Sequence, residues 1–239
     1  MPLRGPGRAL VILGAAVGTA ATLAAGSRQA APVPPAASAS PSADALEEAY
    51  RANNVGVALL EQFRHEEAAA SFRRALELAP GLALARANLA VALLNVPQLE
   101  EALAEARAAT LLMPGVPQPL YVLGLAARGS GAAEDAAAAF RAVRDIDPRD
   151  VGARVNLGQL LLQERRYPEA IAELRAAVEA EPHNATAVYN LGLALVRSGQ
   201  SEEGQRTMDR FRALKEGGYA TLLANSYPEQ GRYAEALAS

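Results

Sequence analysis

Four asparagines, separated by multiples of 34 residues, are the side chains of this 239-residue sequence best placed to do chemistry. They are Asn54, Asn88, Asn156 and Asn190, and Val122 fills the remaining slot of the series. Each amide offers one acceptor oxygen and two donor hydrogens, so it can pair with both the C=O and the N–H of a peptide backbone. The pattern therefore indicates recognition of an extended chain. The alternative is that this asparagine packs between neighbouring elements and recurs only because the fold recurs.

Side chains suited to catalysis or metal binding are scarce and scattered. There is no cysteine, and the two histidines, His65 and His183, lie in separate predicted turns without an HExxH pairing. No GxSxG or GxxxxGK[ST] motif is present. Adjacent acids such as Glu100 and Glu101 mark helix starts, where they favour the positive end of the helix dipole. We expect neither an enzyme nor a bound metal or cofactor. A net charge of −3 without a basic stripe argues against nucleic acid.

Several other residue types recur at the same 34-residue step and predict the elements that hold the asparagines. The recurrent positions are Pro80, Pro114, Pro148 and Pro182; Ala68, Ala102, Ala136 and Ala170; and Gly56, Gly124, Gly158 and Gly192, with Ala90 in the open glycine slot. Each unit is typical of two amphipathic helices. The glycine lets the second helix cross closely, and the proline ends that helix. One hairpin cannot bury both apolar faces, so we expect neighbouring units to stack.

With the bulky residues Phe72 and Phe140 in its second helices, this pattern resembles the tetratricopeptide repeat family. The resemblance implies an all-α, right-handed superhelical solenoid of about five helix-turn-helix repeats plus a partial sixth. Residues 44–218 hold the five repeats, which are 49–82, 83–116, 117–150, 151–184 and 185–218. Repeat two carries Ala106 where its neighbours carry phenylalanine. Repeat five has no closing proline, so we expect its second helix to run to Gly217 and Gly218, where glycine can adopt a left-handed conformation.

In this family the first helix of each repeat lines a concave groove, which implies that the four asparagines form a ladder along it. The resemblance also places Tyr50, Tyr121, Gln159 and Tyr189 in the groove. The predicted groove is polar to aromatic and nearly uncharged. Arg128 lies at the far end of its helix, which argues against a clamp for a terminal carboxylate. The implied partner is a protein or peptide, held as an extended segment.

The first 43 residues have a different character from the repeats. Residues 1–27 carry Arg4 and Arg8, then an uncharged apolar run, then the small residues Gly26 and Ser27. This order is typical of a secretory signal peptide, and the alternative is an uncleaved membrane anchor. Either one predicts a periplasmic or secreted protein, in the second case anchored to the inner membrane. Residues 28–43 are rich in Pro, Ala and Ser and predict a disordered linker.

The end of the sequence, residues 219–239, contains Gly-Arg-Tyr-Ala-Glu-Ala-Leu at 231–237, which matches the start of a second repeat helix. We expect a partial sixth repeat or truncated helices here. The stretch 208–239 is also similar to the end of tetratricopeptide regions that precede FG-GAP/UnbV-type domains in exported bacterial proteins.

The sequence as a whole predicts two alternative functions. The first is an exported scaffold or adaptor that binds an extended polypeptide in the cell envelope. The alternative is an N-terminal docking module of a longer exported protein, whose activity lies in a missing C-terminal domain.

Overall fold

The computed structural model describes residues 41–96, 98–218, 220–224, 227 and 229–239. All of them belong to one compact unit, Ser40–Ser239. The predicted signal or anchor, and the predicted linker up to residue 40, lie outside the described residues. Within the described part of the chain, no helix is both long and apolar enough to cross a membrane.

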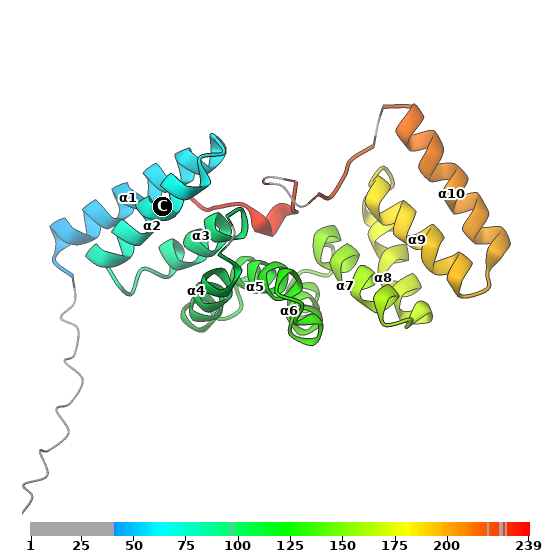
Figure 1. Cartoon of the computed structure of the whole chain (residues 1–239), viewed down its shortest axis with the longest axis horizontal. Coiled ribbons are helices and arrows are strands. Elements are labelled where there is room, and N and C mark those ends of the chain that lie inside the picture. Colours follow the sequence, from blue (N-terminus) through cyan, green and yellow to red (C-terminus); the bar gives the residue numbers. More distant parts are fainter. Residues whose placement is uncertain (1–40, 97, 219, 225–226, 228) are drawn as a thin grey trace, which may run out of the picture. The chain divides into compact units, whose positions relative to one another are not determined.

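Helices paired as hairpins make up most of the described chain (Figure 1). The ten α-helices found there are α1 (Ala43–Glu61), α2 (His65–Leu78), α3 (Ala83–Leu94), α4 (Leu99–Leu112), α5 (Pro117–Gly129), α6 (Ala133–Ile146), α7 (Val151–Gln163), α8 (Tyr167–Ala180), α9 (Ala185–Arg197) and α10 (Ser201–Glu216). Odd-numbered helices are the first helices of the five repeats. Each helix packs against the next one along the chain. The protein is therefore an all-α solenoid, because each hairpin completes its core against its neighbours.

Glycines in the first helices let the two helices of a hairpin approach closely, as the sequence predicts. A methyl group on Gly56 would lie 2.5 Å from the ring of Phe72, and one on Gly124 would lie 2.8 Å from the ring of Phe140. Repeat two places the small residues Ala90 and Ala106 at these two positions, and both are fully buried. In repeat two, Ala106 therefore lacks the ring found in repeats one and three, and Ala90 on the facing helix adds a methyl group where those repeats have glycine.

The turn inside repeats one, three, four and five uses a left-handed residue at the same register position. Gly131 (φ +82°) and Gly199 (φ +89°) fill it in repeats three and five, whereas Phe63 (φ +59°) and Arg165 (φ +61°) fill it in repeats one and four. A side chain makes this conformation costly, and glycine does not. Gly131 and Gly199 therefore let the turns of repeats three and five adopt this geometry without strain.

Helix α10 closes the array with a polar surface. Gly204 is its one buried residue, while Phe211 and Leu214 pack partly against the core. The helix ends at Glu216, and Gly218 adopts φ +72°, so the predicted glycine stop is confirmed. A polar terminal helix is what a solenoid needs where no further repeat follows.

The partial sixth repeat expected at residues 219–239 is not what the described residues form. They contain no α-helix and only one 3-10 turn, Arg232–Ala234, and the other described residues form turns, a bend, one isolated bridge or no regular structure. Helix α10 offers too little apolar surface for another hairpin to stack upon. The segment instead packs against the first helices of the repeats.

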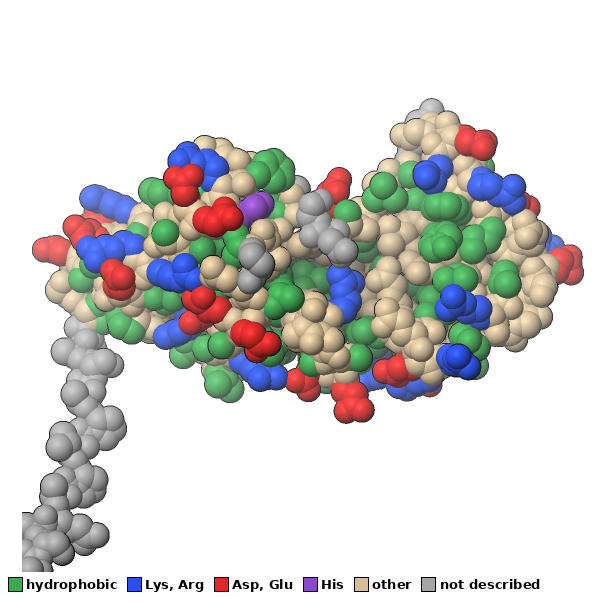
Figure 2. All heavy atoms as spheres, in the orientation of Figure 1, with side chains coloured by type: hydrophobic (Ala, Val, Ile, Leu, Met, Phe, Trp, Pro, Cys, Tyr) green, Lys and Arg blue, Asp and Glu red, His purple; other side chains and the backbone are tan. Residues whose placement is uncertain are grey.

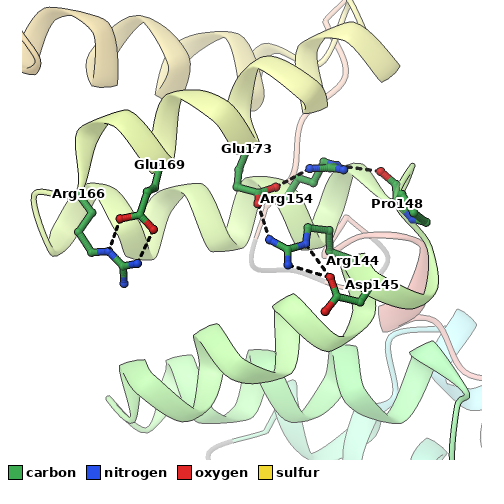
Figure 3. A network of polar contacts seen from close by, with 7 residues as sticks. All are labelled: Arg144, Asp145, Pro148, Arg154, Arg166, Glu169 and Glu173. Carbon is green, nitrogen blue, oxygen red and sulfur yellow. Dashed lines mark hydrogen bonds and ion pairs between the residues drawn. The ribbon is translucent and has the colours of Figure 1, made fainter.

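Ion pairs join successive repeats (Figure 3). The carboxylate of Glu173 on α8 accepts hydrogen bonds from Arg144 on α6 (2.6 Å) and Arg154 on α7 (2.5 Å), and Arg154 Nε donates to Pro148 O (2.8 Å). These contacts fasten repeat four to repeat three. More exposed pairs between second helices recur at a spacing of 28 residues: Arg73–Glu101, Arg107–Asp135 and Arg175–Glu203.

Candidate polypeptide-binding groove

The described residues between 220 and 239, here called the return segment, lie along the first helices from α9 to α1 (Figure 1). At one end, the Thr221 N–H donates to His183 O (3.0 Å), and the Ala185 N–H donates to Thr221 O (2.9 Å). At the other end, Ser239 contacts Asn54 on α1. The described residues of the segment therefore contact both the last and the first repeat, and the first helices form a groove that accepts extended backbone.

Asn88 on α3 pairs with both backbone groups of Leu237. Its Nδ2 donates to Leu237 O (2.8 Å), and the Leu237 N–H donates to Asn88 Oδ1 (2.9 Å). Asn88 is fully buried, and its Nδ2 also donates to Asn53 Oδ1 (2.8 Å), which fixes the orientation of the amide. Such a pair reads the backbone of the bound residue and leaves its side chain free.

Asn54 on α1 repeats this arrangement with Ser239. The Ser239 N–H donates to Asn54 Oδ1 (2.9 Å), and Asn54 Nδ2 donates to Ser239 O (3.3 Å). Equivalent asparagines in neighbouring repeats thus pair with residues two apart in the bound segment. Alternate residues of extended backbone face the same side, so this two-residue step matches the repeat.

Repeat three lacks the asparagine, and another side chain continues the step. Gln118, one helical turn before Val122 on α5, donates from Nε2 to Glu235 O (2.7 Å). Sequence reasoning missed Gln118 because it lies outside the 34-residue series. The direction and register of the bound segment had to be known before this position could be singled out.

Tyr121 holds the middle of the return segment. Its buried Oη donates to Gln230 O (2.6 Å) and accepts from Asn156 Nδ2 (3.1 Å). Burial, followed by the negative charge of Asp150, raises the pKa of Tyr121 well above its usual range, so the hydroxyl keeps its proton. Gly231 (φ +113°) lies so close to Tyr121 Oη that a methyl group there would overlap it. The register at Gly231 is therefore set by steric fit.

An acidic pair at the turn between repeats three and four binds the segment through charge. Asp147 accepts hydrogen bonds from Arg232 and from Tyr233 Oη (2.9 Å), and Asp150 Oδ2 lies 3.8 Å from Arg232 Nη2. Partial burial acts to raise the pKa of Asp147, but hydrogen bonds from Tyr233, the Arg149 amide and Arg232 outweigh it and lower the pKa. Burial raises the pKa of Asp150 despite its hydrogen bond to the Ala153 amide.

The remaining predicted groove residues have other surroundings. Asn156 and Asn190 donate to carbonyls of their own helices, Gly152 O and Thr186 O (both 2.8 Å). Gln159 lines a cleft of about 550 Å³ beside the return segment, together with Arg128. Tyr50 contributes its backbone carbonyl, which accepts from Ser239 Oγ (3.4 Å).

Tyr189 borders a second, apolar cleft of about 310 Å³, with Asn190, Phe211 and Leu222. In Figure 2, hydrophobic side chains gather over the end of the array formed by α9 and α10, while acidic and basic side chains intermingle elsewhere on the visible face. The four asparagines are thus brought to one face of the array, but only Asn54 and Asn88 pair with the described residues of the return segment.

The groove is less neutral than the sequence predicts. Asp147 and Asp150 contact the return segment, and Arg128 lines a cleft of the groove and donates to Asn156 and Gln159. These residues stand at helix ends and turns, and only the packing of successive repeats turns them inward. Among the side chains that the structure describes, no three of His, Cys, Asp and Glu gather as they would around a metal ion.

Comparison with protein-family models agrees with this architecture. Two models described as tetratricopeptide repeat match residues 46–82 and residues 121–185 and 155–204, which together make up about half of the chain. The protein belongs to the tetratricopeptide repeat family. Proteins built from such repeats generally act as scaffolds for protein–protein interaction. No curated protein matches the sequence.

Solved structures of this fold are similar over most of the described chain. MamA of Desulfovibrio magneticus RS-1 is 18% identical, with a TM-score of 0.66, over 72% of this chain and 97% of that one. YrrB is 22% identical, with a TM-score of 0.62, over 71% and 88%. Pseudomonas aeruginosa PilF is 20% identical, with a TM-score of 0.63, over 71% and 78%. At these identities the likeness is one of fold.

Proposed function

We propose that this protein is a scaffold of the cell envelope that binds an extended polypeptide segment in the groove formed by its first helices. The observation that carries the proposal is the two-point pairing of Asn88 with the N–H and C=O of Leu237, repeated by Asn54 with Ser239. A groove that forms such pairs with its own chain has the chemistry to form them with another chain. YrrB, which shares the fold, is described as having an unusual peptide-binding site.

Binding through the backbone makes a specific demand on the ligand. Removal of the N–H equivalent to that of Leu237 leaves the buried Oδ1 of Asn88 unpaired, which costs about 1–3 kcal/mol. Changes to side chains that point out of the groove have little effect by comparison. Leu237 is 43% exposed, so a change to its side chain can be compared with a change to its backbone.

The proposal is tested with labelled synthetic peptides of sequence 229–239 and the full 239-residue chain. One peptide carries a methyl group on the amide nitrogen equivalent to Leu237, whose N–H donates to Asn88. We expect fluorescence anisotropy to show binding about tenfold weaker or more for this peptide. Any competition from the return segment is the same for both peptides, so the ratio isolates the backbone pair.

Two matched peptides serve as controls. Methylation of the amide equivalent to Glu235, for which the structure gives no hydrogen bond, should weaken binding much less. Replacing the leucine side chain with alanine should do likewise. Equal affinities for the peptides methylated at the Leu237 and Glu235 positions would refute recognition through the backbone.

The location in the envelope rests on residues 1–27 and is tested separately. Antibody raised against residues 49–218 should detect the protein in the periplasmic or membrane fraction of lysed cells. A band slightly below 24.9 kDa indicates cleavage of a signal peptide, and a band at 24.9 kDa in the membrane fraction indicates an anchor. Recovery of the protein only with cytoplasmic markers would contradict export.

A further inference from the structure

The return segment occupies the part of the groove where the proposed partner would pair with asparagine and glutamine side chains. Its described residues contact first helices from α9 to α1, and they include the partners of Asn54, Asn88, Gln118 and Tyr121. A partner that uses these same side chains cannot bind while the segment is in place. The groove residues therefore serve one polypeptide at a time.

The fit of the segment sets a sequence pattern for any occupant. Gly231 has no space for a side chain beside Tyr121, and Ala234 is fully buried within the core cluster that includes Tyr121 and Phe140. Between them, Arg232 and Tyr233 reach Asp147. An occupant thus needs glycine, a basic residue, a tyrosine and alanine in succession, followed by extended backbone.

The conformation that the segment has in the groove differs from the one that its own residues favour. The run Ala-Glu-Ala-Leu at 234–237 consists of strong helix formers, yet in the groove only Arg232–Ala234 form a single 3-10 turn. Its conformation is therefore imposed by groove contacts and opposed by intrinsic propensity, a conflict that weakens the bound state. Segments with little regular structure of their own open at low free energy.

We propose that the return segment is a displaceable internal competitor, and that the partner is a polypeptide segment of the same Gly-Arg-Tyr-Ala pattern. This inference rests on the proposed function, because it concerns the same groove. A competitor in the same chain acts at an effective concentration in the millimolar range, so it excludes weaker ligands. If the groove is open for about 1–10% of the time, the apparent affinity for a partner falls by about 10- to 100-fold.

The test compares variants of the full chain against one probe, the labelled peptide of sequence 229–239. Gly231→Ala adds a methyl group that overlaps Tyr121 Oη, and Arg232→Ala removes the contacts with Asp147 and Asp150. Both changes lie outside the α-helices, and circular dichroism should show unchanged helix content. We expect each variant to bind the peptide at least tenfold more tightly than the unmodified chain does. Glu235→Gln, whose side chain is exposed and whose backbone contact is kept, should bind as the unmodified chain does.

The outcomes separate this inference from the proposed function. If the unmodified chain, Gly231→Ala and Arg232→Ala bind the labelled peptide with equal affinity, internal competition is overturned while groove binding stands. Equal binding of a scrambled peptide overturns the sequence pattern. Absence of binding to every variant contradicts the proposed function itself.

Discussion

Pairs of facing residues set the distance between the two helices of each repeat. Gly124 faces Phe140, Gly158 faces Leu174, and in each case an added methyl group would lie within 3 Å of the facing side chain. In repeat two the register places Ala90 opposite Ala106. The size of one residue is thus coupled to the size of the other, because a close-packed core tolerates neither overlap nor voids.

This coupling predicts the result of a double-mutant cycle. Gly124→Ala should lower the free energy of unfolding by about 1–3 kcal/mol through overpacking. Phe140→Ala should lower it by about 3–5 kcal/mol through the cavity it leaves. The double variant recreates the alanine pair of repeat two, so its loss should fall short of the sum by about 1 kcal/mol or more. Urea denaturation followed by circular dichroism measures all three, and simple additivity would argue against the coupling.

Arg165 occupies a left-handed position that two other repeats give to glycine. Arg165→Gly should raise the free energy of unfolding by up to about 1 kcal/mol, because the strain of φ +61° is relieved. Glu164→Gly is the matched control, since its φ of −75° is ordinary and glycine there brings only an entropic loss. The midpoint of thermal unfolding should rise for the first variant and fall for the second. A lower midpoint for Arg165→Gly would contradict the expected relief of strain.

Contacts between elements are of two kinds along this array. Glu173 is largely buried, with 13% of its side chain exposed, and it bridges Arg144 and Arg154 on two other helices (Figure 3). The recurrent pairs at 28-residue spacing are more exposed, and about 40% of each side chain is exposed even in the pair of Arg73 with Glu101. Removing one charge of a buried ion pair costs more than removing one of an exposed pair, because water cannot solvate the charge that remains.

Glu173→Gln should therefore destabilise the protein by about 3 kcal/mol, since it leaves the partly buried Arg154 without a carboxylate and leaves Arg144 with Asp145 alone. Glu101→Gln, at the exposed pair, should change the free energy of unfolding by less than about 1 kcal/mol. Chemical denaturation of both variants in the same buffer gives the comparison. Equal losses would show that the network around Glu173 contributes no more than a surface pair.

Over the whole molecule, the return segment adds contacts that a solenoid otherwise lacks. Repeats contact only their neighbours, whereas this segment touches both α9 and α1. Its charged contact with Asp147 makes the attachment sensitive to acid. The pKa of Asp147 is lowered while the segment is bound and returns toward about 3.9 when Tyr233 and Arg232 leave. A lowered pKa stabilises the bound form above that ordinary value, and the contribution is lost as pH falls through the pKa of the bound form.

Acidification should accordingly release the segment as the pH falls below about 4. The sequence contains no tryptophan, so Leu237→Trp supplies a single fluorescent reporter at an exposed side chain. Its anisotropy should fall on release while helical circular dichroism is still retained. In an Asp147→Asn background the reporter should be more mobile at neutral pH, with a flatter dependence on pH. An unchanged transition in that background would exclude Asp147 as the acid-sensitive contact.

Much of the fold follows from local sequence signals. The 34-residue recurrence of glycine, alanine and proline predicts the hairpins and their stacking, because each residue acts through its own backbone geometry or side-chain size. The glycine stop after α10 is predicted for the same reason. The series of asparagines is also visible in the sequence, and their use in binding a partner remains a prediction.

Only the tertiary structure decided what lies in the groove. Residues 231–237 resemble the start of a repeat helix, and local propensity alone predicts a helix there. The polar surface of α10 offers no face for another hairpin, whereas Asn54, Asn88 and Gln118 offer hydrogen bonds to extended backbone more than 100 residues away in the chain. The sequence by itself determined the repeats and their register, because these depend on residues close together in the chain. The conformation of the return segment, and the roles of Gln118 and Asp147, depend on surfaces that exist only after the repeats have stacked.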